Sequence, residues 1–521
     1  MNDRWELVAK ATEFVAEEMG VALRRSALSP NIRERMDHSC AVLTADAKIA
    51  AQAEHIPVHL GSFKIGSENL MAWLSREAIS VDEGDMVVVN DPYVSGTHLN
   101  DVMLLAPVAR HGRTAAYVVS KAHLVDVGGP SPGSLNPEAR TLHAEGLVIP
   151  PTKLVRKGTV VREVLSWMAE NFKDGPTAIG DVFAEIAANR MGIQRVAGLF
   201  DRFGTRSVQV GWEESIDRTR QTVHRSLAGW KAGRFRAVDS IEWAGSFLPI
   251  RLELRVSDRA VVADFARSHP QVEAPINAVL GVTYSATAFA VRCALRSLIT
   301  TNSGFYDCVN VHAPSGSIVN PTSPAPVSGG NVETTQRIAD VVFLALSHAL
   351  PDRIPAASAG TMMNVMLGGH RASGPYWAYY ETIGGGTGAR PRSDGVSGVQ
   401  TNMTNTLNTP IEIAEMEYPL FFTGYSFRSH SGGRGKHTGG NGLIRSFRAR
   451  SPTTLSVLSD RFLRSPWGLE GGRPGQPGRI TIVRGKRRIS MPSKFVTDLA
   501  PGDEVILETP GGGGFGKPTD A

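Results

Sequence analysis

Apolar positions recur with two different periods along the chain, and the segments with each period are grouped rather than interleaved. Within the first 30 residues they recur about every 3.6 positions, which predicts an amphipathic helix. The strongest helical patterns lie between 160 and 232, and another runs from 332 until Pro351 ends it. Short apolar runs typical of β-strands occupy much of the rest, above all the glycine-rich last 170 residues.

This grouping predicts an α+β fold: a multi-part chain with antiparallel sheets, a helical middle region and a glycine-rich, β-rich C-terminal part. At 521 residues the chain is too long for one compact core. We expect four parts. These are an N-terminal α/β part over 1–155, a helical segment over 156–235, an α+β part over 236–325, and a helix followed by the glycine-rich part over 326–521.

Residues 101–123 predict a single antiparallel hairpin, because two strand-like runs flank a short turn in which Gly112 can adopt a positive φ. Uninterrupted pairing from that turn places Asp101 opposite Ala122, and a register shifted by one residue places it opposite His123. Directly opposed residues lie about 4.5–5.5 Å apart. The hairpin therefore brings an aspartate and a histidine to one end of the sheet.

His98 lies three residues before Asp101, in the turn at the same end of this hairpin. Two imidazoles and a carboxylate would converge there, and these groups are ligands of first-row divalent metals. A second His-x-x-Asp pair, His123 and Asp126, falls at the same end. A polar cluster that caps a turn at a sheet edge explains the same residues without a metal. The residues alone leave both interpretations open.

Two further groups have chemistry-bearing side chains. His55 and His59 are four residues apart, but Pro57 between them argues against a shared helical face. Each is interpreted as a pocket or core histidine rather than a ligand. Asp37 stands at the start of a predicted strand, where an ion pair with a neighbouring arginine also explains it.

The glycine-rich stretches do not form a recognisable nucleotide site. The string "GGGGFGKPT" at 511–519 resembles a phosphate loop, but Pro518 stands where Ser or Thr would bind magnesium. The stretches at 384–388 and 432–442 lack the spacing of a dinucleotide fingerprint and predict tight turns. An ATP site of a known kind is therefore not predicted on this chain.

Composition narrows the class of protein. No run approaches 18 apolar residues and the N-terminal helix lacks a continuous apolar segment, so we expect a cytoplasmic protein without a membrane span. A net charge of +5 with one compact basic run, at 484–488, does not favour nucleic-acid binding. Three cysteines without CxxC spacing fit a reducing compartment.

Several longer strings resemble the hydantoinase B/oxoprolinase family, and the resemblance runs across essentially the whole chain. That family includes the B-type subunits of ATP-dependent N-methylhydantoinases and lactamases and the C-terminal half of 5-oxoprolinase. It also includes the metal-bearing subunits of acetone and acetophenone carboxylases. The strings are "MDHSCAVLTADAKIAAQAEHIPVHLGS", "VNDPYVSGTHLNDV", "SKAHLVDVGG", "EGLVIPPTKL", "GGNVETTQRIADVV", "MTNTLNTPIEIAEMEYP", "SPWGLEGGRPG" and "TPGGGGFG".

The resemblance implies a site for a divalent metal such as manganese, zinc or iron, because the carboxylase branch holds one with a His-x-x-Asp pair and a later His. In this sequence those positions are His98, Asp101 and His123. It suggests Asp37 as a further ligand or close neighbour. Asp126 becomes a catalytic candidate that could orient an imidazole, and His59 a catalytic candidate in the pocket.

The sequence also departs from the family's pattern. Members often show histidines in the stretch that matches "GVQTNMTNTLNTP", where this chain has Gln400 and Asn402. If those histidines assist catalysis in other members, the substrate or the rate differs here.

The resemblance further implies a function shared between two chains. Family members use ATP and magnesium on an A-type partner chain to phosphorylate an amide oxygen, and the B-type chain carries the intermediate onward. We therefore expect a hetero-oligomeric, ATP-dependent cyclic amide hydrolase, in which the metal activates water or the substrate. A ketone carboxylase that captures CO2 is the alternative, and a scaffold for the partner is a third.

Overall fold

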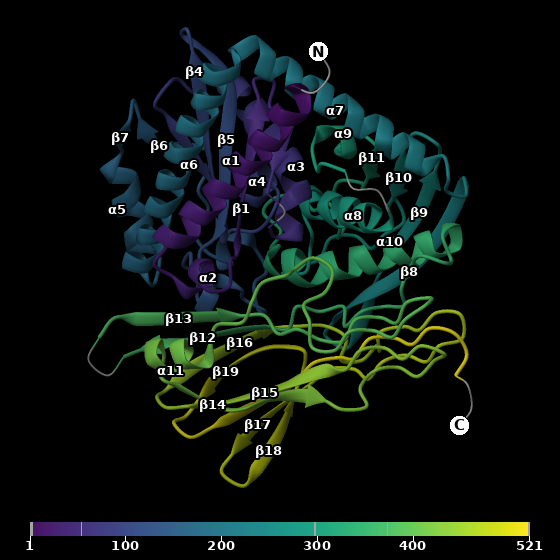
Figure 1. Cartoon of the computed structure of the whole chain (residues 1–521). Helices are drawn as coiled ribbons and strands as arrows, with labels where there is room; N and C mark the ends of the chain where they lie inside the picture. Colours follow the sequence, from purple (N-terminus) through teal and green to yellow (C-terminus); the bar gives the residue numbers. More distant parts are fainter. Residues whose placement is uncertain (1–3, 54, 296–298, 372–373, 519–521) are drawn as a thin grey trace.

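The computed structural model describes residues 4–53, 55–295, 299–371 and 374–518. The fold is mixed α and β with mainly antiparallel sheets, which confirms the predicted α+β class. In Figure 1 the chain as far as α10 forms the upper part, and the strands from β12 onward form the lower part. None of the helices in the described ranges is both long and apolar enough to cross a membrane.

The first sheet has seven antiparallel strands in the order β2-β1-β5-β4-β3-β6-β7. Its strands are β1 (His38–Thr44), β2 (Ile49–Gln52), β3 (Met86–Val89), β4 (Asp101–Arg110), β5 (Arg113–His123), β6 (Thr152–Arg156) and β7 (Thr159–Val160). Helices cover both faces of this sheet. Successive residues of a strand point to opposite faces, so neighbouring residues of β5 contact different helices. Ser120 donates a hydrogen bond to Glu185 of α6 (Gly175–Phe203), while Lys121 donates to Ser62 of α3 (Pro57–Arg76).

The predicted helical segment corresponds to three helices: α5 (Arg162–Asn171), α6 and α7 (Thr205–Leu227). The N-terminal α1 (Arg4–Ser26) packs against α6 and α7, and buried Trp212 donates to Thr12 Oγ1 at 2.8 Å. Several other helical pieces are short. They are α2 (Pro30–Arg33), α4 (Pro92–Ser95), α9 (Ser303–Tyr306), α11 (Ile411–Glu417) and the 3-10 turns Pro132–Ser134 and Leu142–Ala144.

A second sheet has the strand order β11-β10-β9-β8 and packs against two helices. Its members are β8 (Gly233–Trp243), β9 (Ser246–Val256), β10 (Val261–Asp264) and β11 (Val309–His312), with α8 (Leu280–Ala294) and α10 (Thr335–Ala349). The helix predicted from 332 does not begin as an α-helix, because Gly330–Thr334 form a π-helical turn. Thr334 Oγ1 there donates to the Ile276 carbonyl at 2.6 Å.

Two antiparallel sheets build the C-terminal part, in the orders β13-β12-β16-β19 and β14-β15-β20-β17-β18. The strands are β12 (Asn364–His370), β13 (Tyr376–Glu381), β14 (Leu420–Arg428), β15 (Gly442–Ala449), β16 (Thr453–Leu458), β17 (Arg479–Arg484), β18 (Arg487–Met491), β19 (Lys494–Leu499) and β20 (Glu504–Glu508). Both sheets contribute to one hydrophobic cluster, which is distinct from the large cluster under the first two sheets.

The prediction of a tight turn is wrong at 384–388, which has no turn or bend, whereas 432–442 bends at Gly432 and at Gly435–Lys436 and closes with a bond from Gly439 N to Gly433 O. None of the glycines in these stretches has a positive φ. Parts of both stretches bond side by side with the C-terminal glycines: Gly440 N donates to Thr387 O, and Gly512 N donates to Gly440 O, both at 2.9 Å. A Cβ on Gly512 would lie against the Thr387 carbonyl, so only glycine permits this approach.

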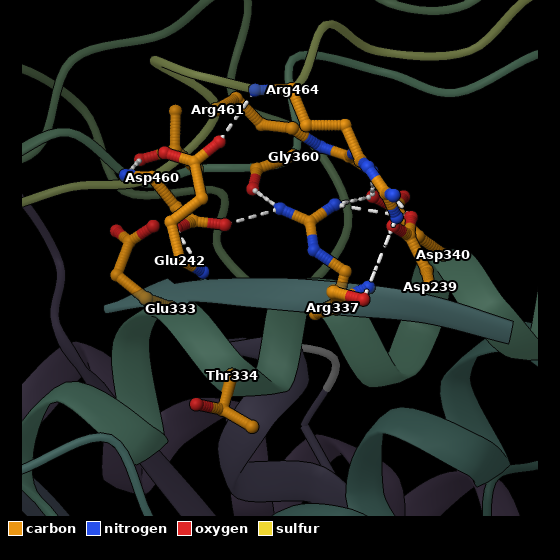
Figure 2. Close-up of polar contacts among 12 residues, drawn as sticks. Asp239, Glu242, Glu333, Thr334, Arg337, Asp340, Gly360, Asp460, Arg461 and Arg464 are labelled. Atoms are coloured by element: carbon orange, nitrogen blue, oxygen red, sulfur yellow. Dashed lines mark hydrogen bonds and ion pairs between the residues drawn. The ribbon is translucent and has the colours of Figure 1, made fainter. Parts of the chain in front are cut away.

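A buried ion network joins the C-terminal part to the rest of the chain, as Figure 2 shows. Arg337 of α10 contacts Asp340 at 2.7 Å and Asp460, which follows β16, at 2.6 Å. Arg461 contacts Asp340 at 2.7 Å and Asp239 of β8 at 2.8 Å. Both arginines are fully buried. Charges this deep are tolerated only when paired, so the network fixes how the two parts are docked.

Candidate metal centre

The β4–β5 hairpin forms with the turn that the sequence predicts, but its pairing is not uninterrupted. Residues 111–112 both have positive φ, as a tight two-residue hairpin turn requires. The register then shifts by one residue between Val108 and Ala109. This β-bulge pairs Asp101 directly with His123, so the pairing with Ala122 is wrong and the shifted register is confirmed.

The turn before β4 returns His98 to the same end of the sheet. Gly96 ends α4 with φ 84°, a left-handed conformation that favours glycine. The Asp101 amide donates to the His98 carbonyl at 3.1 Å. The Asn100 side chain donates to the Leu124 carbonyl at 3.0 Å, which ties this turn to the end of β5.

Three side-chain atoms form a nearly equilateral triangle at this point. His98 Nε2 lies 3.2 Å from Asp101 Oδ1, His123 Nδ1 lies 3.3 Å from the same oxygen, and the two nitrogens are 3.2 Å apart. All three side chains are buried. Among the described residues, this is the one cluster of His, Cys, Asp and Glu side chains with metal-ligand spacing.

The triangle fits a divalent metal. Ligand atoms about 2.1 Å from one ion lie roughly 3.0 Å apart in octahedral and roughly 3.4 Å apart in tetrahedral geometry, which brackets the observed sides. The Asp101 carboxylate faces imidazoles but accepts no well-aligned hydrogen bond from any described residue. A buried carboxylate in that state is costly, and a cation would relieve it.

The charge states at the site also suit a metal, which binds ionised carboxylates and neutral imidazoles. Burial alone would raise the pKa of Asp101, but His98, His59 and His123 together hold that pKa well below its usual value. Burial lowers the pKa of His123, and this effect outweighs the opposing influence of Asp37 and Asp101. The aspartate is therefore ionised and His123 is neutral near pH 7.

His59 lies beside the triangle. It is in the first turn of α3, and its Nε2 is 3.3 Å from Asp101 Oδ2, whereas the contacts of His98 and His123 given above are to Oδ1. Its Nδ1 is 3.1 Å from the Ser39 hydroxyl. His59 is thus placed to orient the Asp101 carboxylate. The residues around His59 in the sequence did not predict this contact.

Asp37 and Asp126 are the other two predicted site residues, and neither is part of the triangle. Asp37 Oδ2 is 3.9 Å from His123 Nδ1, near the triangle but outside the cluster with metal-ligand spacing. Asp126 accepts hydrogen bonds from the Gly128 and Gly133 amides at 2.9 and 3.0 Å. Burial raises the pKa of Asp126 to about 6, although Lys173 opposes the shift. Its hydrogen bonds hold the glycine loop, and none involves an imidazole among the described residues.

Sequence reasoning missed a residue that the C-terminal part supplies. The Tyr380 ring of β13 stacks on the His123 imidazole, with centroids 4.7 Å apart and planes inclined by 13°. Its hydroxyl donates to Asn364 Oδ1 at 2.9 Å, and Arg35 lies over the ring at 4.5 Å. Asn31 also contributes, since its side chain donates to the His123 carbonyl at 2.7 Å. No local sequence signal connects β13 with β5.

The two positions where the family often shows histidine carry amides with structural partners. Gln400 Nε2 donates to the Thr382 hydroxyl at 3.0 Å. Asn402 Nδ2 donates to Asp340 Oδ1 at 3.0 Å and so joins the buried ion network. Through these bonds, both amides hold the loop that follows β13.

Comparison with known proteins places the chain in a defined group. A family model described as Hydantoinase B/oxoprolinase matches residues 3–518. The chain is 44% identical to a Methanocaldococcus jannaschii protein, over 98% of this chain and 90% of that one. It is 34% identical to 5-oxoprolinase 1 of Arabidopsis thaliana over 96% of this chain, but it spans only 41% of that longer protein. It is 29% identical to a Pseudomonas sp. (strain NS671) protein named as the B-type subunit of a D-/L-hydantoinase, over 99% and 90% of the two chains.

Two solved structures share the fold. An ATP-dependent caprolactamase from Pseudomonas jessenii superposes with a TM-score of 0.91 at 26% identity, over 98% of this chain and 90% of that chain. A nucleotide-free acetone carboxylase superposes with a TM-score of 0.89 at 18% identity, over 99% and 76% of the two chains. The second likeness concerns the fold alone.

Proposed function

This chain belongs to the hydantoinase B/oxoprolinase family, and we propose that it is the B-type subunit of an ATP-dependent cyclic amide hydrolase. The observation that carries the proposal is the buried triangle of His98, Asp101 and His123. It lies in a chain that resembles an ATP-dependent caprolactamase over 98% of its length. A cyclic amide without ring strain is a poor electrophile, and a hydrolase for it needs both activation and a site that stabilises developing charge.

His98, Asp101 and His123 would hold a divalent cation, such as manganese, zinc or iron. A cation bound there supplies Lewis acidity toward an amide or phosphorylated amide and lowers the pKa of water. Asp101 contributes the negative charge, and its ionised state is maintained by the surrounding imidazoles. His59 orients the second oxygen of this carboxylate, and the Asp37 carboxylate lies 3.9 Å from His123 Nδ1.

We assign the two remaining predicted residues to different tasks. His59 is a positioning residue, because it contacts Asp101 and the Ser39 hydroxyl at once. Asp126 keeps the glycine loop at 128–133 in place through two backbone amides. A role of Asp126 on a metal-binding imidazole, which the sequence suggested, is not part of the proposal.

ATP would be used on a partner chain. The described part of the C-terminal glycine-rich segment is engaged in hydrogen bonds with its own neighbours, for example from Gly513 N to Ala357 O at 2.8 Å. It therefore does not offer free amides for a phosphate. A similar protein is named as the B-type subunit of a hydantoinase, so we propose an A-type, ATP- and magnesium-binding partner and a hetero-oligomer.

The test is reconstitution of the two-chain complex. The chain is co-expressed with an A-type partner, supplied with ATP and magnesium, and offered hydantoin, caprolactam and 5-oxoproline. We expect ring opening coupled to ATP cleavage with at least one of these compounds, and its loss in His98→Ala. Parallel reactions with ketones and labelled bicarbonate test the carboxylase alternative. Label in a stable carboxylate, with no amide hydrolysis, would overturn the proposal.

A matched variant separates the metal site from general damage. His348 is an exposed histidine in the last turn of α10, outside the metal-ligand cluster. His348→Ala should keep both bound metal and hydrolysis, whereas His98→Ala should lose both. Full activity in His98→Ala without stoichiometric metal would instead favour the interpretation that the chain scaffolds its partner.

A further inference from the structure

A cavity of about 300 Å³ lies beside the first turn of α3, between that turn, α8 and the segment around α9. Its walls are largely apolar and include Leu60, Ala288, Phe289 and Phe305. His55 and Asn405 supply polar groups to its lining. None of the metal-site residues discussed above lines it, and the proposed chemistry does not yet use it.

The size and charge of this cavity limit what it can hold. A volume of about 300 Å³ is at the lower end of the range of small-molecule sites, roughly 300–1,000 Å³, and is too small for a nucleotide or peptide. Arg292 carries the one permanent positive charge among the described lining residues, and none of these residues is a carboxylate. Arg292 donates to the Ile299 carbonyl at 3.2 Å, and Glu17 Oε2 lies 3.5 Å from His55 Nε2 beside this lining, so a small neutral ring fits best.

The polar groups favour a ligand that both donates and accepts hydrogen bonds. His55 Nδ1 is buried and has no hydrogen-bond partner among the described residues. The Asn405 side chain donates to the His55 carbonyl at 2.8 Å, which holds the two residues together at the lining. An imidazole nitrogen and a carboxamide together complement the N–H and C=O of an amide.

The first turn of α3 connects this cavity to the metal centre. Pro57, Leu60 and Gly61 line the cavity, while His59 on the same turn contacts Asp101. A Cβ on Gly61 would lie 2.5 Å from Ser285 Cα, so the turn is seated directly on α8. A ligand in the cavity therefore rests on the backbone segment that positions His59.

A row of histidines gives a second connection. The ring of His55 lies 5.0 Å from the ring of His38. The next residue along β1, Ser39, contacts His59 through its hydroxyl at 3.1 Å. The row consists of His55, His38 and His59. It begins at the cavity and ends beside the metal ligands.

We propose that this cavity is the recognition site for the substrate ring: a small neutral cyclic amide whose apolar ring contacts Leu60 and Phe289 and whose amide faces His55 and Asn405. This inference rests on the proposed function and names where the substrate binds outside the metal triangle. Binding here recognises the ring at the outer end of the histidine row, before the activated amide reaches the metal triangle.

Cys293 provides a direct probe, because it lines the cavity and is exposed, whereas Cys40 and Cys308 are buried. The chain contains only these three cysteines. The rate at which N-ethylmaleimide labels Cys293 is measured on the purified full chain, with and without saturating hydantoin, caprolactam or 5-oxoproline. The compound that fits should slow labelling about tenfold, which corresponds to about 1.4 kcal/mol of protection.

The reconstituted complex gives the second readout. A maleimide adduct on Cys293 should raise the KM for the hydrolysed amide about tenfold while bound metal stays stoichiometric. Cys293→Ser, measured against its own KM before treatment, should lose the response to the reagent. A Cys293→Ser/Ser80→Cys variant carries its thiol in the exposed loop before β3, and its adduct should leave KM unchanged.

The outcomes separate this inference from the proposed function. If the complex hydrolyses a cyclic amide but the Cys293 adduct leaves KM unchanged and the amide does not protect the thiol, the recognition site is elsewhere and the inference is overturned. If no cyclic amide is hydrolysed, the proposed function fails. The labelling experiment then decides alone: protection by one of the three compounds supports the cavity as a binding site, and no protection overturns it.

Discussion

The stacking of Tyr380 on His123 gives the sharpest test of how the C-terminal part supports the metal site. The ring lies parallel to the imidazole at 4.7 Å, and the hydroxyl is bonded to Asn364. These two contacts can be removed separately. Tyr380→Phe keeps the ring and deletes the hydroxyl, whereas Tyr380→Leu removes the stacking surface as well.

The magnitudes follow from the contacts. An aromatic stack is worth about 0.5–1.5 kcal/mol, so Tyr380→Leu should weaken metal binding between about twofold and about tenfold. The hydroxyl donates its hydrogen bond away from the imidazole, to Asn364 Oδ1. Tyr380→Phe leaves that buried oxygen unpaired and should cost about 1–3 kcal/mol of folding stability, with metal affinity changed by less than about twofold.

The assay is a metal titration of the metal-free chain against a chromophoric chelator, with the ion that the wild-type chain carries when purified. Folding stability is measured separately by urea unfolding of the metal-free variants. The two measurements should rank the variants differently: affinity falls mainly in Tyr380→Leu, and stability already falls in Tyr380→Phe.

Two results would refute this reasoning. Equal losses of affinity in both variants would mean that the hydroxyl, not the ring, orients His123. Unchanged affinity in Tyr380→Leu would mean that the imidazole is held by its backbone alone, for example through the bond from Asn31 to the His123 carbonyl.

Four further outcomes are expected. His123→Ala should remove stoichiometric metal in elemental analysis, whereas Asp126→Asn should keep it, because Asp126 bonds to loop amides. Arg337→Met removes one of the two cations that contact each of the buried Asp340 and Asp460 carboxylates and should cost about 3–5 kcal/mol in urea unfolding, and an unchanged midpoint would contradict this. Burial, with Asp460 nearby, raises the pKa of Glu333 from its ordinary 4.5 to about 8. The native state therefore binds the proton of the Glu333 carboxyl more tightly than the unfolded state does. The stability that this group contributes is full below pH 4.5 and is lost as pH rises through about 8. Between these pH values, the unfolding free energy of Glu333→Gln should decline less than that of the wild-type chain. Gly440→Ala should lower the thermal midpoint, because its Cβ would meet the Val396 carbonyl, and an unaltered midpoint would show that the glycine layer can spread.

The sequence by itself determined the features that depend on local pattern. Helices such as α6 and α7 carry a sustained 3.6-residue period, and the turn at 111–112 needs residues that tolerate positive φ. His98 and Asp101 share one turn, and the hairpin brings His123 within one register step of them. These relations involve neighbours along the chain or across one tight turn, so few alternatives compete.

Tertiary structure decided the rest, because contacts between distant segments follow no period in the sequence. The bulge between Val108 and Ala109 aligns Asp101 with His123, and turn chemistry alone allowed either register. Tyr380 reaches His123 because contacts between distant segments dock the C-terminal part, among them the buried ion network with α10 and β8 and the bond from Arg35 to the Tyr380 carbonyl. Glycines such as Gly386, Gly440 and Gly512 lie in closely packed segments, because neighbouring backbones leave no room for a Cβ there.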